Sequence, residues 1–79
     1  MSKWIKFQDT YIKVDAIETI NRYTSDNQYG ISFIVTFSTS KMCFSNNYKT
    51  AEERDQYFNR LLELCDIKES DVRELLGVN

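Results

Sequence analysis

The sequence contains no histidine and no proline, and only two glycines and two cysteines. Without histidine, the chain lacks the side chain that most often serves as a general base near neutral pH and as a zinc ligand. Two cysteines alone cannot complete a tetrahedral structural zinc site. With so little glycine there is no glycine-rich loop that could hold phosphates or a dinucleotide. These absences predict a protein that is not an enzyme and binds no metal ion or cofactor.

Long apolar runs are also missing. No stretch approaches the ~18–20 apolar residues that a helix needs to cross a bilayer. The first ten residues, MSKWIKFQDT, lack the apolar core of a secretory signal. We therefore expect a cytoplasmic protein without membrane contact. Cys43 and Cys65 are then reduced thiols, and the usual environment of free cysteine predicts that both are buried.

The length of 79 residues predicts a single domain, residues 1–79. So small a domain buries roughly 60–65% of its unfolded surface, and we expect marginal stability without a partner. Charge is unevenly distributed: residues 1–50 carry six basic and four acidic residues, and residues 51–79 carry four basic and eight acidic ones. The second half therefore has a net charge of −4, which is typical of a solvated acidic helix face. The first half has a net charge of +2, which is too little for a basic surface that binds nucleic acid.

The first half of the chain has the pattern of strands. Apolar and polar residues alternate on either side of a turn at 8–10, which predicts a hairpin over 4–14. Its apolar face consists of Ile5, Phe7, Ile12 and Val14. Around 14–20 the apolar spacing changes to three, which indicates one helical turn capped by Asp15, or a bulge. Extended chain follows, then a polar turn at 25–30 and a second hairpin over 31–45, with Met42 and Phe44 on one face.

The second half has the pattern of helices. Thr50 and Glu53 form a capping-box signature, and an apolar stripe at helical spacing follows it. The stripe consists of Tyr57, Phe58, Leu61, Leu62 and Cys65. Ser70 and Gly77 predict the start and end of a short second helix, and the pattern leaves open whether the first helix continues through Asp66.

Strands followed by helices predict an α+β fold. We expect an antiparallel β-meander of four or five strands over 1–48 and a helical segment over 50–77. The C-terminal helix would pack on one face of the sheet, and the short terminal helix would follow it. The other face of the sheet would be open to solvent.

The open face is expected to carry aromatic and basic side chains. The alternation of the first hairpin places Trp4, Lys6, Tyr11 and Lys13 together, away from the helix. One interpretation is contact with a protein, including a second copy of the chain. A second is a solvated surface on which lysine stems cover the rings. The third is a platform on which bases of single-stranded nucleic acid stack, with Arg22 contributing a further cation.

Protein contact is the favoured interpretation because a large exposed aromatic patch usually marks an interface, whereas an acidic chain binds phosphates poorly. An open meander also has edge strands, and Lys41 is one of few charges placed to prevent their pairing. We therefore predict a homodimer in which the edge strands of two copies pair. A further hypothesis is that the helix acids occupy a basic groove of a nucleic-acid enzyme. These acids are Glu52, Glu53, Asp55 and Glu63.

The stretch ISFIVTFSTSKMCFSNNYKTAEERDQYFNRLLEL combines a strand hairpin with a helix opened by TAEE. This layout resembles that of small uncharacterised proteins of bacteria and their phages. In that pattern a glycine commonly opens the hairpin turn, where this chain has Thr39 and Ser40. The resemblance implies a non-catalytic interaction module, such as a self-associating accessory or inhibitor protein of a phage or mobile element. It names no partner.

Overall fold

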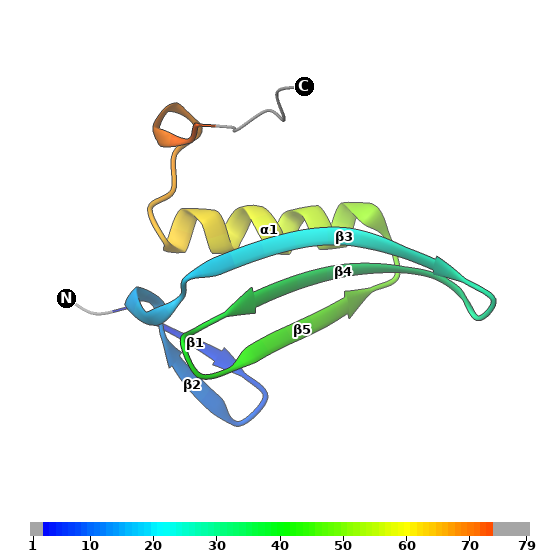
Figure 1. Ribbon diagram of the computed structural model, residues 1–79, viewed down its shortest axis with the longest axis horizontal. Helices are drawn as coiled ribbons and strands as arrows, with labels where there is room; N and C mark the ends of the chain where they lie inside the picture. The colour runs from blue at the N-terminus through cyan, green and yellow to red at the C-terminus, as the bar shows by residue number, and fades with distance from the viewer. Residues whose placement is uncertain (1–2, 74–79) are drawn as a thin grey trace, which may run out of the picture.

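The computed structural model describes residues 3–73 of the chain. It contains five strands and one α-helix, together with 3-10 turns at Val14–Ala16 and Glu69–Asp71. The strands and the helix are β1 (Trp4–Phe7), β2 (Thr10–Lys13), β3 (Thr19–Asn27), β4 (Gly30–Ser38), β5 (Cys43–Tyr48) and α1 (Ala51–Leu64) (Figure 1). This is the predicted α+β class. No helix within residues 3–73 is long and apolar enough to span a bilayer.

The strands form two antiparallel sheets. β1 pairs with β2 alone, and β3, β4 and β5 form a second sheet in that order. Each sheet therefore has fewer strands than the predicted meander. The 3-10 turn at Val14–Ala16 separates β2 from β3, and it begins one residue before Asp15 with no side-chain cap. The helical turn that the spacing of 14–20 predicts is present, whereas its predicted Asp15 cap is not.

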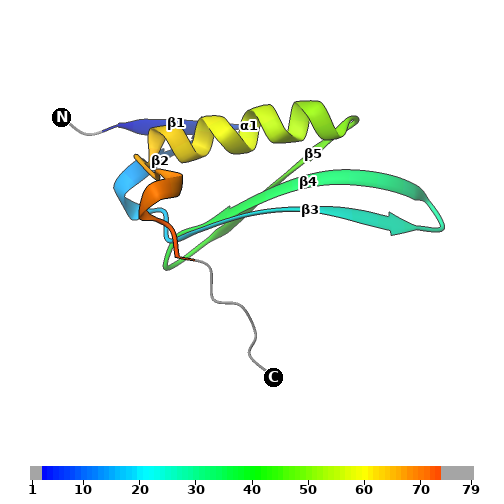
Figure 2. The same cartoon turned by 90° about the horizontal axis from the view of Figure 1, so that it is seen from above.

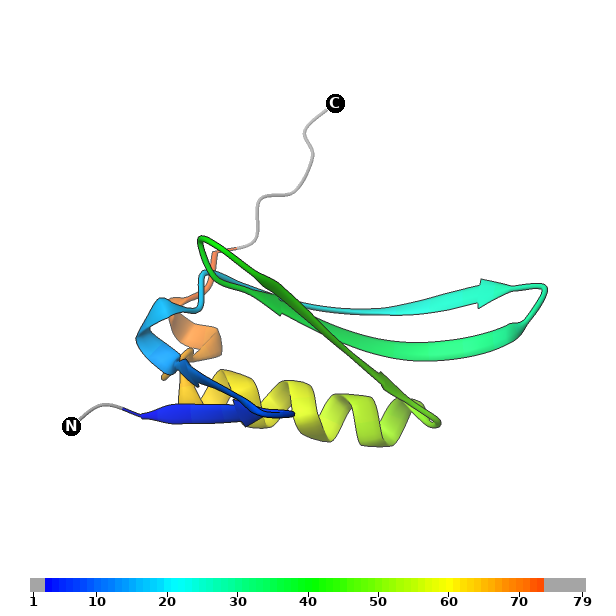
Figure 3. The same ribbon diagram turned by 90° about the horizontal axis from the view of Figure 1, so that it is seen from below.

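The β1–β2 hairpin and α1 cover the same face of the three-stranded sheet (Figures 2 and 3). Between these layers the apolar side chains of both sheets and of the helix form one core. Its buried members are Ile5, Ile12, Val14, Val35, Phe37, Phe44 and Leu61. Phe7 of the hairpin meets Phe44 and Phe37 edge-on, with ring centroids 5.3 and 6.0 Å away. Aromatic contact of this kind joins the hairpin to the larger sheet.

Helix α1 begins and ends with recognisable caps. Thr50 Oγ1 accepts a hydrogen bond from the Glu53 amide at 3.1 Å, as the capping signature predicts. At the other end the Ile67 amide donates to the Leu62 carbonyl and the Asp66 amide to the Glu63 carbonyl. Asp66 has a φ of +57°, which completes a Schellman motif. The helix therefore does not continue through Asp66.

A 3-10 turn, Glu69–Asp71, occupies the start of the predicted terminal helix. Val72 and Arg73, which the prediction includes in that helix, are not helical, and residues 74–77 with the Gly77 stop lie outside the described residues. The turn between β3 and β4 is also shorter than the predicted 25–30, because the strands continue to Asn27 and resume at Gly30. Gly30 has a φ of +121°, and Asn27 Oδ1 accepts a hydrogen bond from the Tyr29 amide at 2.8 Å.

The expected burial of both cysteines is wrong for Cys43. This residue is exposed at the start of β5, where it faces Ser38 across the sheet. Residues that face each other in this way lie on the same side of a sheet, and Cys43 lies on the side away from the core. Cys65 is half-buried at the end of α1, and both thiols are free.

Candidate interaction surfaces

The outer face of the β1–β2 hairpin holds the four residues predicted from the alternation, which we call the hairpin patch: Trp4, Lys6, Tyr11 and Lys13. Trp4 faces Lys13 across the hairpin and Lys6 faces Tyr11. The two rings are 58% and 65% exposed, because Ile5 and Ile12 turn the opposite side of the hairpin into the core. Lys6 Nζ lies 5.9 Å from the centroid of the Tyr11 ring, within cation–π range.

The position of this patch in the molecule differs from the expectation. The sequence placed it on the open face of one continuous sheet, whereas the hairpin is a separate sheet on the same side as α1 (Figure 2). The open face of the three-stranded sheet is therefore another surface, formed by different residues. A two-residue period identifies which side chains share a face, but not which sheet the strand joins.

Arg22 does not belong to the hairpin patch. It projects from β3, where its guanidinium lies 4.6 Å from the Phe58 ring centroid and donates to Asp55 Oδ1 at 3.0 Å. The hydrogen bond from Arg54 to the same oxygen is the main reason why the pKa of Asp55 is below its ordinary value, and the charges of Arg54 and Arg22 lower it further. Asp55 thus pairs within the fold. This leaves one fewer acid for the hypothesis that the helix binds a basic groove.

A groove of about 350 Å³ borders the hairpin patch. It runs between β2 and the loop from β4 to β5, where Thr39 Oγ1 accepts hydrogen bonds from the amides of Lys41 and Met42. Met42 was predicted to share a face with Phe44, but its side chain is 54% exposed. The reason is that β5 begins at Cys43, one residue after Met42. The groove is lined by Thr10, Tyr11, Ile12, Lys13, Ala16, Thr39, Ser40, Lys41, Met42 and Phe44.

The groove adds Lys41 and Met42 to the surface around Tyr11 and Lys13. The sequence carried no signal for this neighbourhood, because Met42 is 31 positions from Tyr11 and falls outside the strand period. The extended surface has an apolar centre with lysines around it. Such a composition is suited to contact with an acidic and apolar partner surface.

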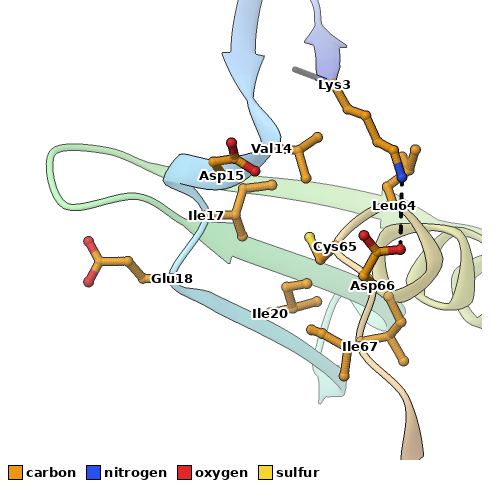
Figure 4. Close-up of a pocket in the computed structure, with 11 residues that line it drawn as sticks. Lys3, Val14, Asp15, Ile17, Glu18, Ile20, Leu64, Cys65, Asp66 and Ile67 are labelled. Atoms are coloured by element: carbon orange, nitrogen blue, oxygen red, sulfur yellow. Dashed lines mark ion pairs between the residues drawn. The ribbon is translucent and has the colours of Figure 1, made fainter. Parts of the chain in front are cut away.

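A second cavity, of about 500 Å³, lies between the Val14–Ala16 turn, the start of β3 and the end of α1 (Figure 4). Its lining is Lys3, Val14, Asp15, Ile17, Glu18, Ile20, Leu62, Leu64, Cys65, Asp66 and Ile67. Lys3 Nζ lies 3.9 Å from Asp66 Oδ1 in a solvent-exposed ion pair. Burial raises the pKa of the Cys65 thiol, and Asp66 and Asp15 raise it further. The thiol is therefore a poor nucleophile at neutral pH.

Tyr48 and Tyr57 form a small aromatic pair between β5 and α1. Their ring centroids are 5.6 Å apart, and Tyr48 Oη accepts a hydrogen bond from Asn46 Nδ2 at 3.3 Å. Burial raises the pKa of both phenols. Both side chains therefore remain neutral near pH 7, and their role is to pack β5 against the helix.

No family model, curated protein or solved structure matches this chain. Within residues 3–73, no three histidine, cysteine, aspartate or glutamate side chains gather closely enough to hold a metal ion.

Proposed function

We propose that this protein is a non-catalytic interaction module that binds another protein through the hairpin patch and the adjoining Lys41 and Met42. The observation that carries this proposal is the exposure of Trp4 and Tyr11 on one face of the hairpin, with Met42 exposed beside Tyr11 in the adjoining groove. In a small domain, large apolar side chains left in water on one surface favour an interface. Lys6, Lys13 and Lys41 around them favour a partner with acidic groups.

The module would work in the cytoplasm, where Cys43 and Cys65 stay reduced. An accessory or inhibitory role in a bacterium, phage or mobile element is the setting that the resemblance implies. Self-association is part of the same proposal, since a domain of this size gains stability by burying surface against a second chain.

Binding can be tested by capture from a bacterial extract with three immobilised proteins. These are the wild type, a Trp4→Ser/Tyr11→Ser double variant, and Tyr29→Ser. Tyr29 is 88% exposed at the β3–β4 turn and is a matched aromatic control. We expect one protein to be retained by the wild type and by Tyr29→Ser, and to be lost from the double variant. Equal retention by all three would contradict a role for the hairpin patch.

Single-stranded nucleic acid is the second candidate, favoured by the lysines that accompany Trp4 and Tyr11. Two observations weigh against it: Lys6 already lies over the Tyr11 ring, and the chain has a net charge of −2. Trp4 is the only tryptophan, so its fluorescence reports directly on the patch. Quenching by oligonucleotides at low salt would favour this candidate. Unchanged emission at micromolar protein would exclude it.

A further inference from the structure

The three-stranded sheet ends in two edge strands, β3 and β5. An edge strand presents backbone N–H and C=O groups that can pair with a strand of another chain. The sequence has no proline to block either edge. The side chains along the two edges nevertheless differ, and this difference indicates which edge is free to pair.

Side chains of α1 already bind to β3. Arg54 Nη1 donates to the Tyr23 carbonyl oxygen at 3.3 Å and to Thr24 Oγ1 at 2.9 Å. The Arg54 side chain is only 13% exposed, and its guanidinium also lies 5.4 Å from the Phe33 ring centroid. Arg22 adds its own ion pair to Asp55. A strand that added to this edge would meet two charged side chains held in place by the fold.

β5 has none of these features. Its sequence CFSNNY contains no charged residue, and all six residues pair in unbroken register with β4. Phe44 holds the strand to the core, whereas Cys43, Ser45 and Asn47 are exposed on the other side. Figure 3 faces this edge, and no described element runs along it. A regular, uncharged and uncovered edge is a template for strand pairing.

We propose that two copies of this chain pair antiparallel through β5 and so form one continuous sheet with three strands from each copy. This inference rests on the proposed function, because it assigns the surface for self-association. The second copy is the favoured occupant on grounds of charge. Two-fold pairing sets β5 against itself, so any charge on the strand would be duplicated across the contact, and β5 carries none.

The geometry of a sheet restricts the register of this pairing. Residues that face each other must point to the same side of the sheet, so the two-fold axis passes through a residue and not between two. An axis at Ser45 would set Lys41 against Lys49 of the partner subunit. An axis at Asn46 offsets these lysines by two positions, which weakens their repulsion, and sets Phe44 against Tyr48 of the partner subunit. We therefore place Asn46 at the axis, with both α1 helices on the same side of the joined sheet.

The expected dimer is weak and salt-dependent. β5 spans only about 20 Å, so the contact is shorter than most stable interfaces provide. Lys41 and Lys49 flank the strand in both copies. Since salt screens their mutual repulsion, dimerisation should strengthen as salt rises. A contact between lysines and acidic groups would weaken under the same conditions.

The test is sedimentation velocity of the full chain over a concentration series with Asn47→Lys and Asn21→Lys as matched variants. Both positions are exposed on the outer side of the sheet, but Asn47 lies on β5 and Asn21 on β3. We expect the wild type to form dimers, Asn47→Lys to weaken dimerisation by about tenfold or more, and Asn21→Lys to leave it unchanged. A wild type that stays monomeric throughout would overturn the proposal.

Two other outcomes would also overturn it. Equal loss with Asn21→Lys would indicate face-to-face packing of the sheets. If only the Trp4→Ser/Tyr11→Ser variant fails to dimerise, the dimer contact lies in the hairpin patch. If only Asn47→Lys fails to dimerise, the result supports β5 pairing, even where the hairpin patch binds no other protein.

Asn46→Cys in a Cys43→Ser/Cys65→Ser background tests the register. Oxidation should yield a covalent dimer, because the two thiols face each other across the axis. Asn21→Cys in the same background should remain monomeric. A cross-link that forms equally with Asn21→Cys would contradict the proposed axis.

Discussion

Asp66 stands at the position after the α1 cap where a left-handed backbone is required. Its φ of +57° places the peptide in a region that glycine adopts freely and other residues adopt at a cost of roughly 1–2 kcal/mol. Its ion pair with Lys3 is exposed and compensates little of this cost. The Schellman hydrogen bonds require the conformation, so the residue type and the backbone are in conflict here.

The first prediction is that Asp66→Gly stabilises the protein. Relief of the backbone conflict should raise the free energy of unfolding by about 0.5–1 kcal/mol, measured by urea denaturation. Asp71→Gly is the matched control, because Asp71 is also exposed but has no positive φ. We expect this control to be neutral or slightly destabilising. If Asp66→Gly were the less stable of the two, the Schellman assignment would be wrong.

The second prediction concerns pH and Asp55. The hydrogen bond from Arg54 lowers the folded-state pKa of Asp55 below its ordinary value of 3.8. The ionised form of the Asp55 carboxyl group is therefore more stable in the folded protein than in the unfolded chain. The resulting stabilisation is present above the unfolded-state pKa and is lost as pH falls through the lower folded-state pKa.

Unfolding free energies of the wild type and Asp55→Asn should therefore differ near pH 7 and converge in acid below pH 3.8. Asp26→Asn, at an exposed position of β3, serves as the comparison. A difference between wild type and Asp55→Asn that stayed constant down to pH 2 would show that the ion pair does not stabilise the fold.

At the scale of elements, local signals in the sequence predicted α1 and β4 well. The helix begins at the capping signature of Thr50 and Glu53, and Leu61 of the predicted stripe is buried in the core. Side chains of β4 alternate between the two sides of the sheet as the sequence pattern predicts, with Val35 and Phe37 in the core and Ser32 and Thr36 on the other side. Both signals reside within a few residues, so they predict structure without knowledge of the rest of the chain.

The third prediction is that Thr50→Ala destabilises α1 at its first turn. Loss of the hydrogen bond between Thr50 Oγ1 and the Glu53 amide should cost about 1 kcal/mol, read from chemical denaturation followed by circular dichroism. Thr50→Ser keeps a hydroxyl oxygen at the cap and should retain most of the stability. Equal losses for alanine and serine would mean that the cap bond contributes nothing.

At the scale of the whole molecule, the hairpin is attached by side chains and not by a shared sheet. β1 and β2 pair only with each other, and Phe7 lies against Phe37 and Phe44 of the larger sheet. An isolated two-stranded hairpin is marginal in water, so the hairpin depends on this docking. The hairpin patch therefore keeps its shape only while the core beneath it is intact.

The fourth prediction is that Phe7→Ala loosens the hairpin from the sheet. A core Phe→Ala change costs about 3–5 kcal/mol, and Phe7 is half-buried, so we expect a smaller loss. Hydrogen exchange should show faster exchange in β1 and β2 than in β4 and α1. Tyr11→Ala removes an exposed ring and should leave the exchange pattern unchanged. Uniform acceleration across all strands would show that the hairpin and the sheet unfold as one unit.

The sequence by itself determined where the first hairpin, β4 and α1 form and which of their residues share a face, whereas the face that it predicted for Met42 and Phe44 is wrong. Trp4, Lys6, Tyr11 and Lys13 lie together as predicted, because a period of two is a property of a single strand pair. The binding role assigned to them remains a proposal.

Only the tertiary structure decided how the segments combine. It divided the strands into two sheets, placed the hairpin beside α1, brought Met42 to Tyr11 and directed Arg22 toward Asp55. These outcomes depend on packing between segments that are distant along the chain, and the free energy of such contacts has no local pattern in the sequence. The same packing binds α1 side chains to β3 and leaves β5 uncovered, so the edge available for pairing is likewise a property of the folded molecule.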